Sequence, residues 1–135
     1  MKRCKLSCTM CPYVKTGTNI ENKNFTWKIR KNVDCNTTNV IYMIECTKET
    51  CKEKYIGKSE RRVKKRFDEH RGYVKNKIMS KATGSHFNKP GHNESNMSIT
   101  VLEKVKKKDI FYRKERESYL IRKFNTYYQG MNKQP

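Results

Sequence analysis

The sequence predicts a small α+β domain in which helices flank a three-stranded antiparallel sheet, preceded by a Cys-rich N-terminal segment. Residues 39–46, 53–58 and 97–105 are rich in β-branched and aromatic residues, as strands are. Residues 59–77 and 110–125 instead place apolar residues at helical spacing among charged ones. The length of 135 residues is near the common size of one domain, so the chain can bury a single modest core.

The first two strands are expected to form a hairpin. The stretch NVIYMIEC, residues 39–46, alternates in part between apolar and polar residues, and EKYIGK, residues 53–58, is typical of a second short strand that ends at Gly57. A short turn that carries two Cys joins them. The stretch MSITVLEKV, residues 97–105, supplies the third strand.

Two amphipathic helices are expected, each with a capping residue. Ser59 is a plausible N-cap for residues 59–77, and Asp109 is one for residues 110–125. The apolar residues of the first helix are Val63, Phe67 and Val74, and the stripe of the second is Tyr112, Tyr119, Leu120 and Phe124. Residues 81–96 are rich in Gly, Pro, Asn and Ser and are expected to form a loop, and the tail after residue 125 is turn-rich.

Charge indicates the kind of partner. Lys and Arg number 32 against 13 acidic residues, which gives a net charge of +19 and favours a polyanion, nucleic acid rather than a membrane. No run of 18 or more apolar residues exists, and the N-terminus lacks the apolar core of a signal peptide. We therefore expect an intracellular protein with no membrane partner.

The Cys and His residues form two candidate metal sites. An intracellular chain with six Cys more often uses them as metal ligands than in disulfides. Residues 4–11 hold three Cys and Cys35 follows, which gives four thiolates for one tetrahedral zinc ion. A second set of Cys2His2 type combines the Cys pair of the hairpin with a His pair in the later loop. The first set is Cys4, Cys8, Cys11 and Cys35, and the second is Cys46, Cys51, His86 and His92. Ordinary buried Cys with surface His remain the alternative.

An ordered set of polar residues resembles the GIY-YIG nuclease superfamily, most closely the endonuclease domain of Penelope-like retroelements. The first signature is Val40-Ile41-Tyr42, with Val where the family name has Gly, and the second is Tyr55-Ile56-Gly57. In these retroelements a Cys pair is expected between the signatures and a His pair in the later loop, as here. The resemblance implies a boundary between a zinc-binding segment, residues 1–36, and an endonuclease domain, residues 37–135. It implies catalytic roles for Tyr42, Tyr55, Arg66, His70, Glu117 and Asn132.

The chemistry of phosphodiester cleavage gives these residue types distinct tasks. Glu117 offers the hard oxygen that a single Mg2+ or Mn2+ ion prefers, and Arg66 offers a planar fork of donors for a phosphate. Arg66 and His70 are four residues apart and project from one helix face. The resemblance makes Tyr42 the general base, while His70 would orient it or relay a proton, Tyr55 would contact a phosphate oxygen or position water, and Asn132 would fix the geometry.

The resemblance further implies a nuclear endonuclease that nicks target DNA and exposes a 3′ hydroxyl for reverse transcription. Its partners would be DNA, element RNA and a reverse transcriptase domain, with no small-molecule substrate. Two alternatives stay open. In the first alternative, the chain is a zinc-stabilised nucleic-acid-binding module without catalysis, in which Arg66 and His70 lie on a DNA-facing surface and Glu117 forms an ordinary salt bridge. The poorer alternative is a secreted, disulfide-linked cationic protein.

Overall fold

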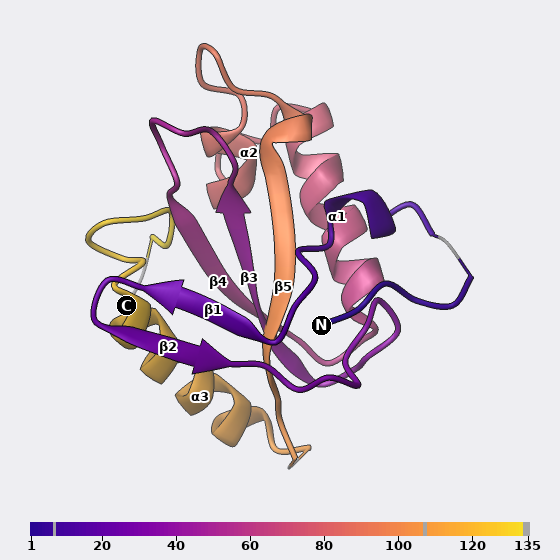
Figure 1. The fold of residues 1–135 in the computed structure, drawn as a ribbon. Helices are drawn as coiled ribbons and strands as arrows, with labels where there is room; N and C mark the ends of the chain where they lie inside the picture. The colour runs from indigo at the N-terminus through magenta and orange to yellow at the C-terminus, as the bar shows by residue number, and fades with distance from the viewer. Residues whose placement is uncertain (7, 107, 134–135) are drawn as a thin grey trace.

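The central sheet has the predicted antiparallel topology. The structure, a computed structural model, describes residues 1–6, 8–106 and 108–133, so the last two residues of the predicted domain lie outside the described residues. Strand β3 (Val40–Cys46) lies between β4 (Lys54–Ser59) and β5 (Met97–Lys104) and is antiparallel to both. The α+β class with a three-stranded sheet is therefore confirmed (Figure 1).

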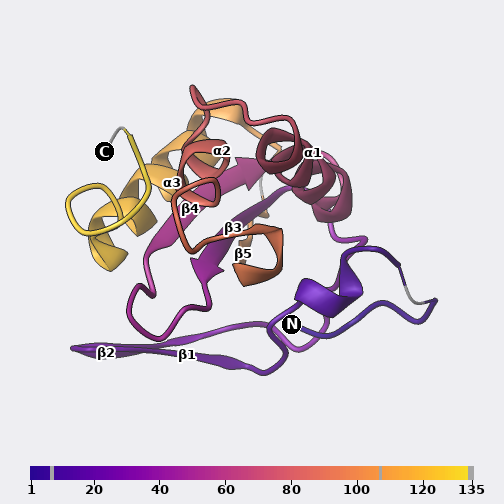
Figure 2. The same cartoon turned by 90° about the horizontal axis from the view of Figure 1, so that it is seen from above.

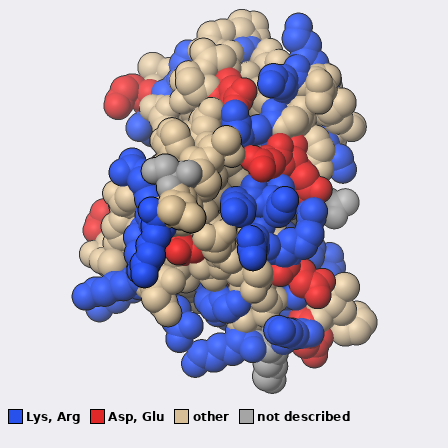
Figure 3. All heavy atoms as spheres, turned by 90° about the vertical axis from the view of Figure 1, so that its right-hand side faces the viewer, with Lys and Arg blue, Asp and Glu red and all other residues tan. Residues whose placement is uncertain are grey.

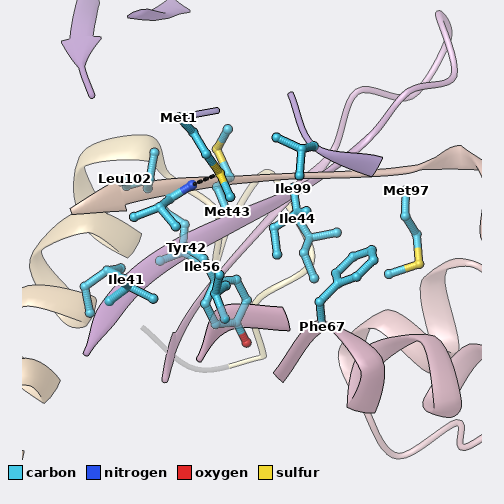
Figure 4. Close-up of a cluster of buried hydrophobic side chains, with 14 of the residues drawn as sticks. Met1, Ile41, Tyr42, Met43, Ile44, Ile56, Phe67, Met97, Ile99 and Leu102 are labelled. Atoms are coloured by element: carbon cyan, nitrogen blue, oxygen red, sulfur yellow. Dashed lines mark hydrogen bonds between the residues drawn. The ribbon is translucent and has the colours of Figure 1, made fainter. Parts of the chain in front are cut away.

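Strand β3 is buried on both faces, which explains its nearly continuous apolar sequence. Successive side chains of a strand point to opposite faces, so Tyr42 and Met43 face different layers. Figure 4 shows Tyr42 and Phe67 on one side of the sheet and Met1 on the other. The Met1 sulfur accepts a hydrogen bond from the Val101 amide at 3.2 Å, which ties the chain start to β5.

Three helices cover one face of this sheet (Figure 2). They are α1 (Val63–Lys75), α2 (Ala82–His86) and α3 (Ile110–Phe124). Helix α1 buries one stripe at helical spacing, made of Val63, Phe67, His70 and Val74. Within the described residues, no helix has the length and apolar character needed to cross a membrane.

The N-terminal segment covers the other face of the sheet (Figure 2). It contains a short 3-10 helix, η1 (Cys11–Tyr13), and a hairpin of β1 (Asn19–Asn22) and β2 (Phe25–Lys28) that the sequence did not predict. The Trp27 indole nitrogen donates to the Leu102 carbonyl at 2.8 Å, which fixes the hairpin to β5. A second 3-10 turn, η2 (Glu94–Asn96), leads into β5.

Several predicted boundaries are wrong for local reasons. Strand β4 continues past Gly57 to Ser59, because residues 58 and 59 still pair with β3. Ser59 is therefore not an N-cap, and its hydroxyl donates to the Arg61 carbonyl while α1 begins at Val63. The predicted cap of the last helix is confirmed, since the Asp109 carboxylate accepts from the Phe111 and Tyr112 amides.

Two further predictions about the helices need correction. Residues 81–96 are not all loop, because Ala82–His86 form α2, where the absence of a side chain at Gly84 lets the helix lie against the Ile78 carbonyl. In α3, Tyr119 is exposed and Ile121 is buried in its place. Leu120 and Phe124 are buried as predicted, so the stripe keeps its centre and only its edge changes, from Tyr119 on one side of Leu120 to Ile121 on the other.

Candidate active site

The two signature strands bring Tyr42 and Gly57 side by side. They are register partners in β3 and β4, and a Cβ atom at Gly57 would lie 2.5 Å from the Tyr42 hydroxyl oxygen and 2.9 Å from the ring of Tyr55. No real side chain tolerates such a contact. Glycine is therefore needed at residue 57 so that the Tyr42 ring can lie across β4 beside Tyr55.

The Tyr42 hydroxyl belongs to a buried chain of hydrogen bonds. It lies 2.7 Å from His70 Nε2, and His70 Nδ1 lies 2.7 Å from the Thr83 hydroxyl of α2. Burial, with added repulsion from Arg66 and Lys81, lowers the pKa of His70 to about 3, so its ring is neutral near pH 7. A neutral imidazole donates through one nitrogen and accepts through the other, so His70 links the two hydroxyls.

The Tyr42 hydroxyl is a weak acid in this setting. Its side chain is fully buried, and burial raises its pKa well above the ordinary value of 10; the hydroxyl of Tyr55 adds to this, and the Arg66 guanidinium opposes it. Burial likewise raises the pKa of Tyr55, and Arg66 again acts against it. Both phenols are therefore protonated at neutral pH, and Arg66 is the group that most favours their ionisation.

Arg66 is held in place by two neighbours on its own helix. Its Nη1 lies 3.0 Å from a Glu69 carboxylate oxygen and 3.3 Å from the Tyr73 hydroxyl. Burial opposes its charge, but the electrostatic influence of Tyr42 and these hydrogen bonds outweigh it, so the pKa of Arg66 lies above its ordinary value. Arg66 is thus a fixed cation directed at both tyrosine hydroxyls.

Glu117 lines a cavity of about 230 Å3 that Tyr55 and Asn132 also line, here called the Glu117 cavity. The Glu117 side chain is 15% exposed, and one of its oxygens lies 3.3 Å from the Lys58 ammonium. Its charge acts on both Tyr42 and Tyr55, so the carboxylate lies near both phenols. The cavity leaves space for several waters or a phosphate beside this carboxylate.

Asn132 holds the second signature in position. Its side chain forms both hydrogen bonds to the backbone of Ile56, at 2.8 Å from the amide and 2.9 Å from the carbonyl, and it accepts from the Thr126 hydroxyl at 2.6 Å. These contacts fix the residue between Tyr55 and Gly57. The Asn132 amide is thereby committed to the backbone, which is the geometry of a positioning residue.

The six predicted residues therefore gather in one region. The ring of His70 lies 5.7 Å from that of Tyr42 and 5.3 Å from that of Tyr55, and Tyr55, Glu117 and Asn132 share a cavity. Sequence reasoning missed four polar neighbours that complete the region: Lys58, Glu69, Tyr73 and Thr83. Spacing could have suggested Glu69 and Tyr73, which lie three and seven residues after Arg66 on one helix; nothing in the sequence marks Thr83.

The N-terminal Cys cluster, defined by Cys4, Cys8, Cys11 and Cys35, has four thiol ligands within 4.8 Å of one another. Three pairs of sulfurs lie 3.5 to 3.6 Å apart and none is bonded in a disulfide. A tetrahedral zinc ion with bonds of ~2.3 Å would hold sulfurs about 3.8 Å apart. A hydrogen bond from the Cys8 amide lowers the pKa of Cys11 to about 6, which favours the thiolate that a metal needs, whereas burial raises the pKa of Cys4 and of Cys35.

The Cys–His cluster, defined by Cys46, Cys51, His86 and His92, also gathers within 4.8 Å. The Cys51 sulfur lies 3.4 Å from His86 Nε2, and His92 Nε2 is buried without a hydrogen-bond partner among the residues that the structure describes. The other nitrogen of His92 donates to the Pro90 carbonyl at 3.3 Å, which leaves the buried nitrogen with a free lone pair. An unpaired buried nitrogen among two thiols and an imidazole fits a zinc ligand.

Comparison with known proteins gave one match. A family model for the GIY-YIG catalytic domain matches residues 38–132, which is most of the chain. The matched residues include the Cys–His cluster and all six predicted site residues. The curated proteins and the solved structures that were searched contain no match to this chain.

Proposed function

Because the chain belongs to the GIY-YIG family, a family of nucleases, we propose that it is a divalent-metal-dependent DNA endonuclease. One observation carries the proposal. The rings of Tyr42 and Tyr55 both pack beside His70, at 5.7 and 5.3 Å, Arg66 lies one helical turn before His70, and Glu117 lines the same cavity as Tyr55, so a cation, a carboxylate and two phenols gather in one region. A salt bridge on a solvated surface would not require two tyrosines to face the same pair of charges.

Arg66 and Glu117 would stabilise the transition state. The guanidinium of Arg66 is planar, charged and pre-positioned by Glu69, so it can donate two hydrogen bonds to a phosphate as negative charge builds up. Glu117 offers a hard oxygen beside open space and would hold a single divalent cation, Mg2+ or Mn2+. Such an ion supplies charge stabilisation to the scissile phosphate and its leaving oxygen. When no divalent cation is bound, the Lys58 ammonium neutralises the negative charge of Glu117.

Tyr42 and His70 would move the proton of the attacking water. Since burial disfavours a standing phenolate, the proton of Tyr42 passes to His70 Nε2 as Tyr42 takes a proton from water. The resulting hydroxide attacks phosphorus, the bond to the 3′ oxygen breaks, and solvent protonates that oxygen. His70 holds its extra proton only briefly, because burial disfavours its charge, and it returns that proton to Tyr42 as Tyr42 releases one to solvent. The products are a 3′ hydroxyl and a 5′ phosphate.

The two metal clusters would be structural zinc sites. Each has four donors in a closed set, whereas a catalytic metal needs an open position. The Cys–His cluster braces the β3–β4 turn against the loop after α2, and the Lys48 ammonium adds a 2.5 Å hydrogen bond to the Gly91 carbonyl across the same junction. This brace supports the strands that carry Tyr42 and Tyr55. The N-terminal Cys cluster would organise residues 1–36 as a zinc-binding segment ahead of an endonuclease domain at residues 37–135.

The resemblance to Penelope-like retroelements supports a more specific role. The Cys pair of the hairpin and the His pair of the later loop, expected in those endonucleases, meet in space. In this role the protein nicks target DNA in the nucleus, and the 3′ hydroxyl primes reverse transcription of element RNA by a reverse transcriptase domain.

A plasmid-nicking assay tests the activity. The parent protein, loaded with zinc, should convert supercoiled DNA to the open circle with Mg2+ or Mn2+. Glu117→Gln should reduce the rate by about 10³-fold or more, the size of effect seen when a preorganised electrostatic group is removed. Glu115→Gln changes charge equally on the same helix and is the matched control. Equal rates for the parent and Glu117→Gln would remove Glu117 as the metal ligand.

The same assay separates the proposal from the alternative of a binding module. Binding of labelled duplex DNA is measured in parallel for the parent and both variants. If all three proteins bind DNA and the parent does not cleave with any divalent metal, the protein is a zinc-stabilised nucleic-acid-binding module.

A further inference from the structure

We propose that a groove between β2 and β5, on the far side of α3 from the Glu117 cavity, binds the phosphodiester backbone of the DNA substrate. The inference rests on the proposed function and assigns a second contact on the same substrate. This β2–β5 groove has a volume of about 560 Å3 and shares no lining residue with the Glu117 cavity. Its walls come from the hairpin strand β2 and the segment that follows it, from β5 with the residues that follow it, and from the first half of α3.

The lining of the groove is strongly basic. Its single acidic residue, Glu103, is already engaged in a two-point ion pair with Arg116, with contacts of 2.8 and 2.6 Å. The four remaining cations have no acid among the lining residues: Lys28, Arg30, Lys104 and Lys106. Figure 3 shows Lys and Arg side chains over much of one face of the molecule, including its lower end, and fewer Asp and Glu side chains among them.

Lys104, which lines the groove, lies near two other cations. The pKa of Lys104 is lowered, first by partial burial and then by the charges of Lys108 and Arg30. Its ammonium donates to the Thr38 backbone carbonyl, a dipole that does not cancel the charge. Folding has thus placed the Lys104 ammonium near two other positive charges, and a polyanion would relieve that repulsion while an uncharged ligand would not.

The groove is formed before any ligand arrives. The Trp27 indole donates to the Leu102 carbonyl at 2.8 Å, and its ring packs against Phe124 with centroids 6.1 Å apart. Both contacts hold β2 against β5 and α3. Because the walls are tied together, a backbone docked between them pays little ordering entropy.

Helix α3 relates the groove to the candidate active site. Arg116 lines the groove and the next residue, Glu117, lines the Glu117 cavity, so the two hollows open on different sides of one helix. A helix with its side chains is about 10 Å across, and DNA advances ~3.4 Å per nucleotide along the axis. A strand that crosses α3 would therefore place the groove roughly three nucleotides from the scissile phosphate.

The test measures binding rather than cleavage. Protein carrying Glu117→Gln is titrated into fluorescein-labelled 24-base-pair DNA at several salt concentrations, and anisotropy gives the affinity. A groove variant adds Arg30→Gln, Lys104→Gln and Lys106→Gln. The matched control adds Lys23→Gln, Lys65→Gln and Lys75→Gln, three exposed cations that do not line the groove.

Each lost phosphate contact reduces the salt slope by about 0.9. We expect the groove variant to lower the slope by about 2 to 3 and to weaken binding by roughly 10²-fold near 0.1 M salt, with a slope change below about one in the control. Equal changes in both variants would overturn the proposal. The single change Arg30→Glu at an exposed residue provides a second measurement if the triple variant does not fold, and it should weaken binding at least tenfold.

Two further outcomes separate the groove from the activity and from another polymer. A parent that never nicks, with a groove variant that still loses affinity, removes the proposed function and keeps the groove. A parent that nicks, with a groove variant that binds like the control, supports the proposed function and overturns the assignment of the groove. If unlabelled RNA duplex displaces the probe from the groove more effectively than DNA of equal length, the assignment of DNA is wrong.

Discussion

The Cys–His cluster and the Glu117 cavity offer metal ions opposite environments within one small domain. The cluster gathers four soft donors within 4.8 Å, and two of them are buried. The cavity offers one hard carboxylate beside about 230 Å3 of open space. Closed sets of soft donors hold zinc and stabilise a fold, whereas an open carboxylate leaves coordination positions for water and phosphate.

From this contrast we expect the Cys–His cluster to govern the stability of the fold and the Glu117 cavity to govern the rate of cleavage. A domain of this size buries a modest core, so a metal ion between its hairpin and its helical face would add folding energy that side-chain packing alone does not supply. The cavity would have the reverse requirement, because the proposed function needs it open to substrate. Variants in the first region should therefore change melting, and variants in the second should change rate alone.

The largest effect should come from Cys46→Ser. Structural zinc contributes about 10–16 kcal/mol in zinc-finger peptides, and loss of one thiolate should lower the unfolding free energy by more than ~3 kcal/mol here. Chemical denaturation and zinc analysis check this, and activity should fall with the folded fraction. Cys35→Ser likewise removes one thiol ligand, in this case from the N-terminal Cys cluster. An unchanged zinc content and melting temperature for Cys46→Ser would contradict the assignment.

Arg66→Lys should affect rate and leave melting unchanged. Lysine keeps the charge but loses the planar pair of donors, so we expect a decrease in kcat of about 10²-fold. Lys65→Arg, an exposed neighbour on the same helix, is the control. A variant that cleaves at the parental rate would mean that charge alone suffices at residue 66.

Acid pH should make the contrast less sharp, because His70 lies in the candidate active site and its protonation is expected to lower the stability of the fold. Its pKa is about 3 in the folded protein against an ordinary value of 6.5. The unfolded chain therefore takes up this proton first as pH falls below about 6.5, and stability falls by ~1.4 kcal/mol per pH unit down to about pH 3. Near pH 5 the loss is about 2 kcal/mol. The slope should be shallower in His70→Gln, measured with excess zinc so that contributions shared by both proteins cancel.

Thr83→Val should give the smallest change, since it keeps the shape and removes one hydroxyl. His70 Nδ1 then loses its partner, which costs about 1 kcal/mol of stability and should slow cleavage roughly fivefold. The pH–rate profile should also shift, because Thr83 no longer fixes the tautomer of His70. Thr83→Ser restores the hydroxyl and should recover the profile. A purely structural role would leave the profile of Thr83→Val unchanged.

The strands and the long helices could be predicted from the sequence because their patterns are local. β-Branched residues mark β3 and β5, and Asp109 marks the start of α3. The hairpin of β1 and β2 could not be predicted in this way. Its strands have four residues each and its burial depends on Leu102, which is distant in the chain. Helix α2 was hidden because Gly84, usually unfavourable in helices, is required there by close packing.

The candidate site was predictable only where residue type suggests a task. Tyr42, Arg66 and Glu117 have side chains that phosphodiester cleavage needs, and the resemblance gave their order. Thr83 and Lys58 carry no such signal, because a threonine in a Gly-rich stretch and a lysine in a basic chain are unremarkable. Their importance comes from tertiary contacts with His70 and Glu117.

Helix α2 has a mechanical consequence. Thr83 and His86 lie three residues apart on this one short rigid element, on neighbouring parts of one face and about 4.5 Å apart along the axis. Because both residues belong to one helical element, a shift of His86 would also shift Thr83, whose 2.7 Å hydrogen bond to His70 is sensitive to displacement. On the zinc-site assignment proposed above, we therefore expect metal binding at His86 to influence the alignment of Thr83 with His70.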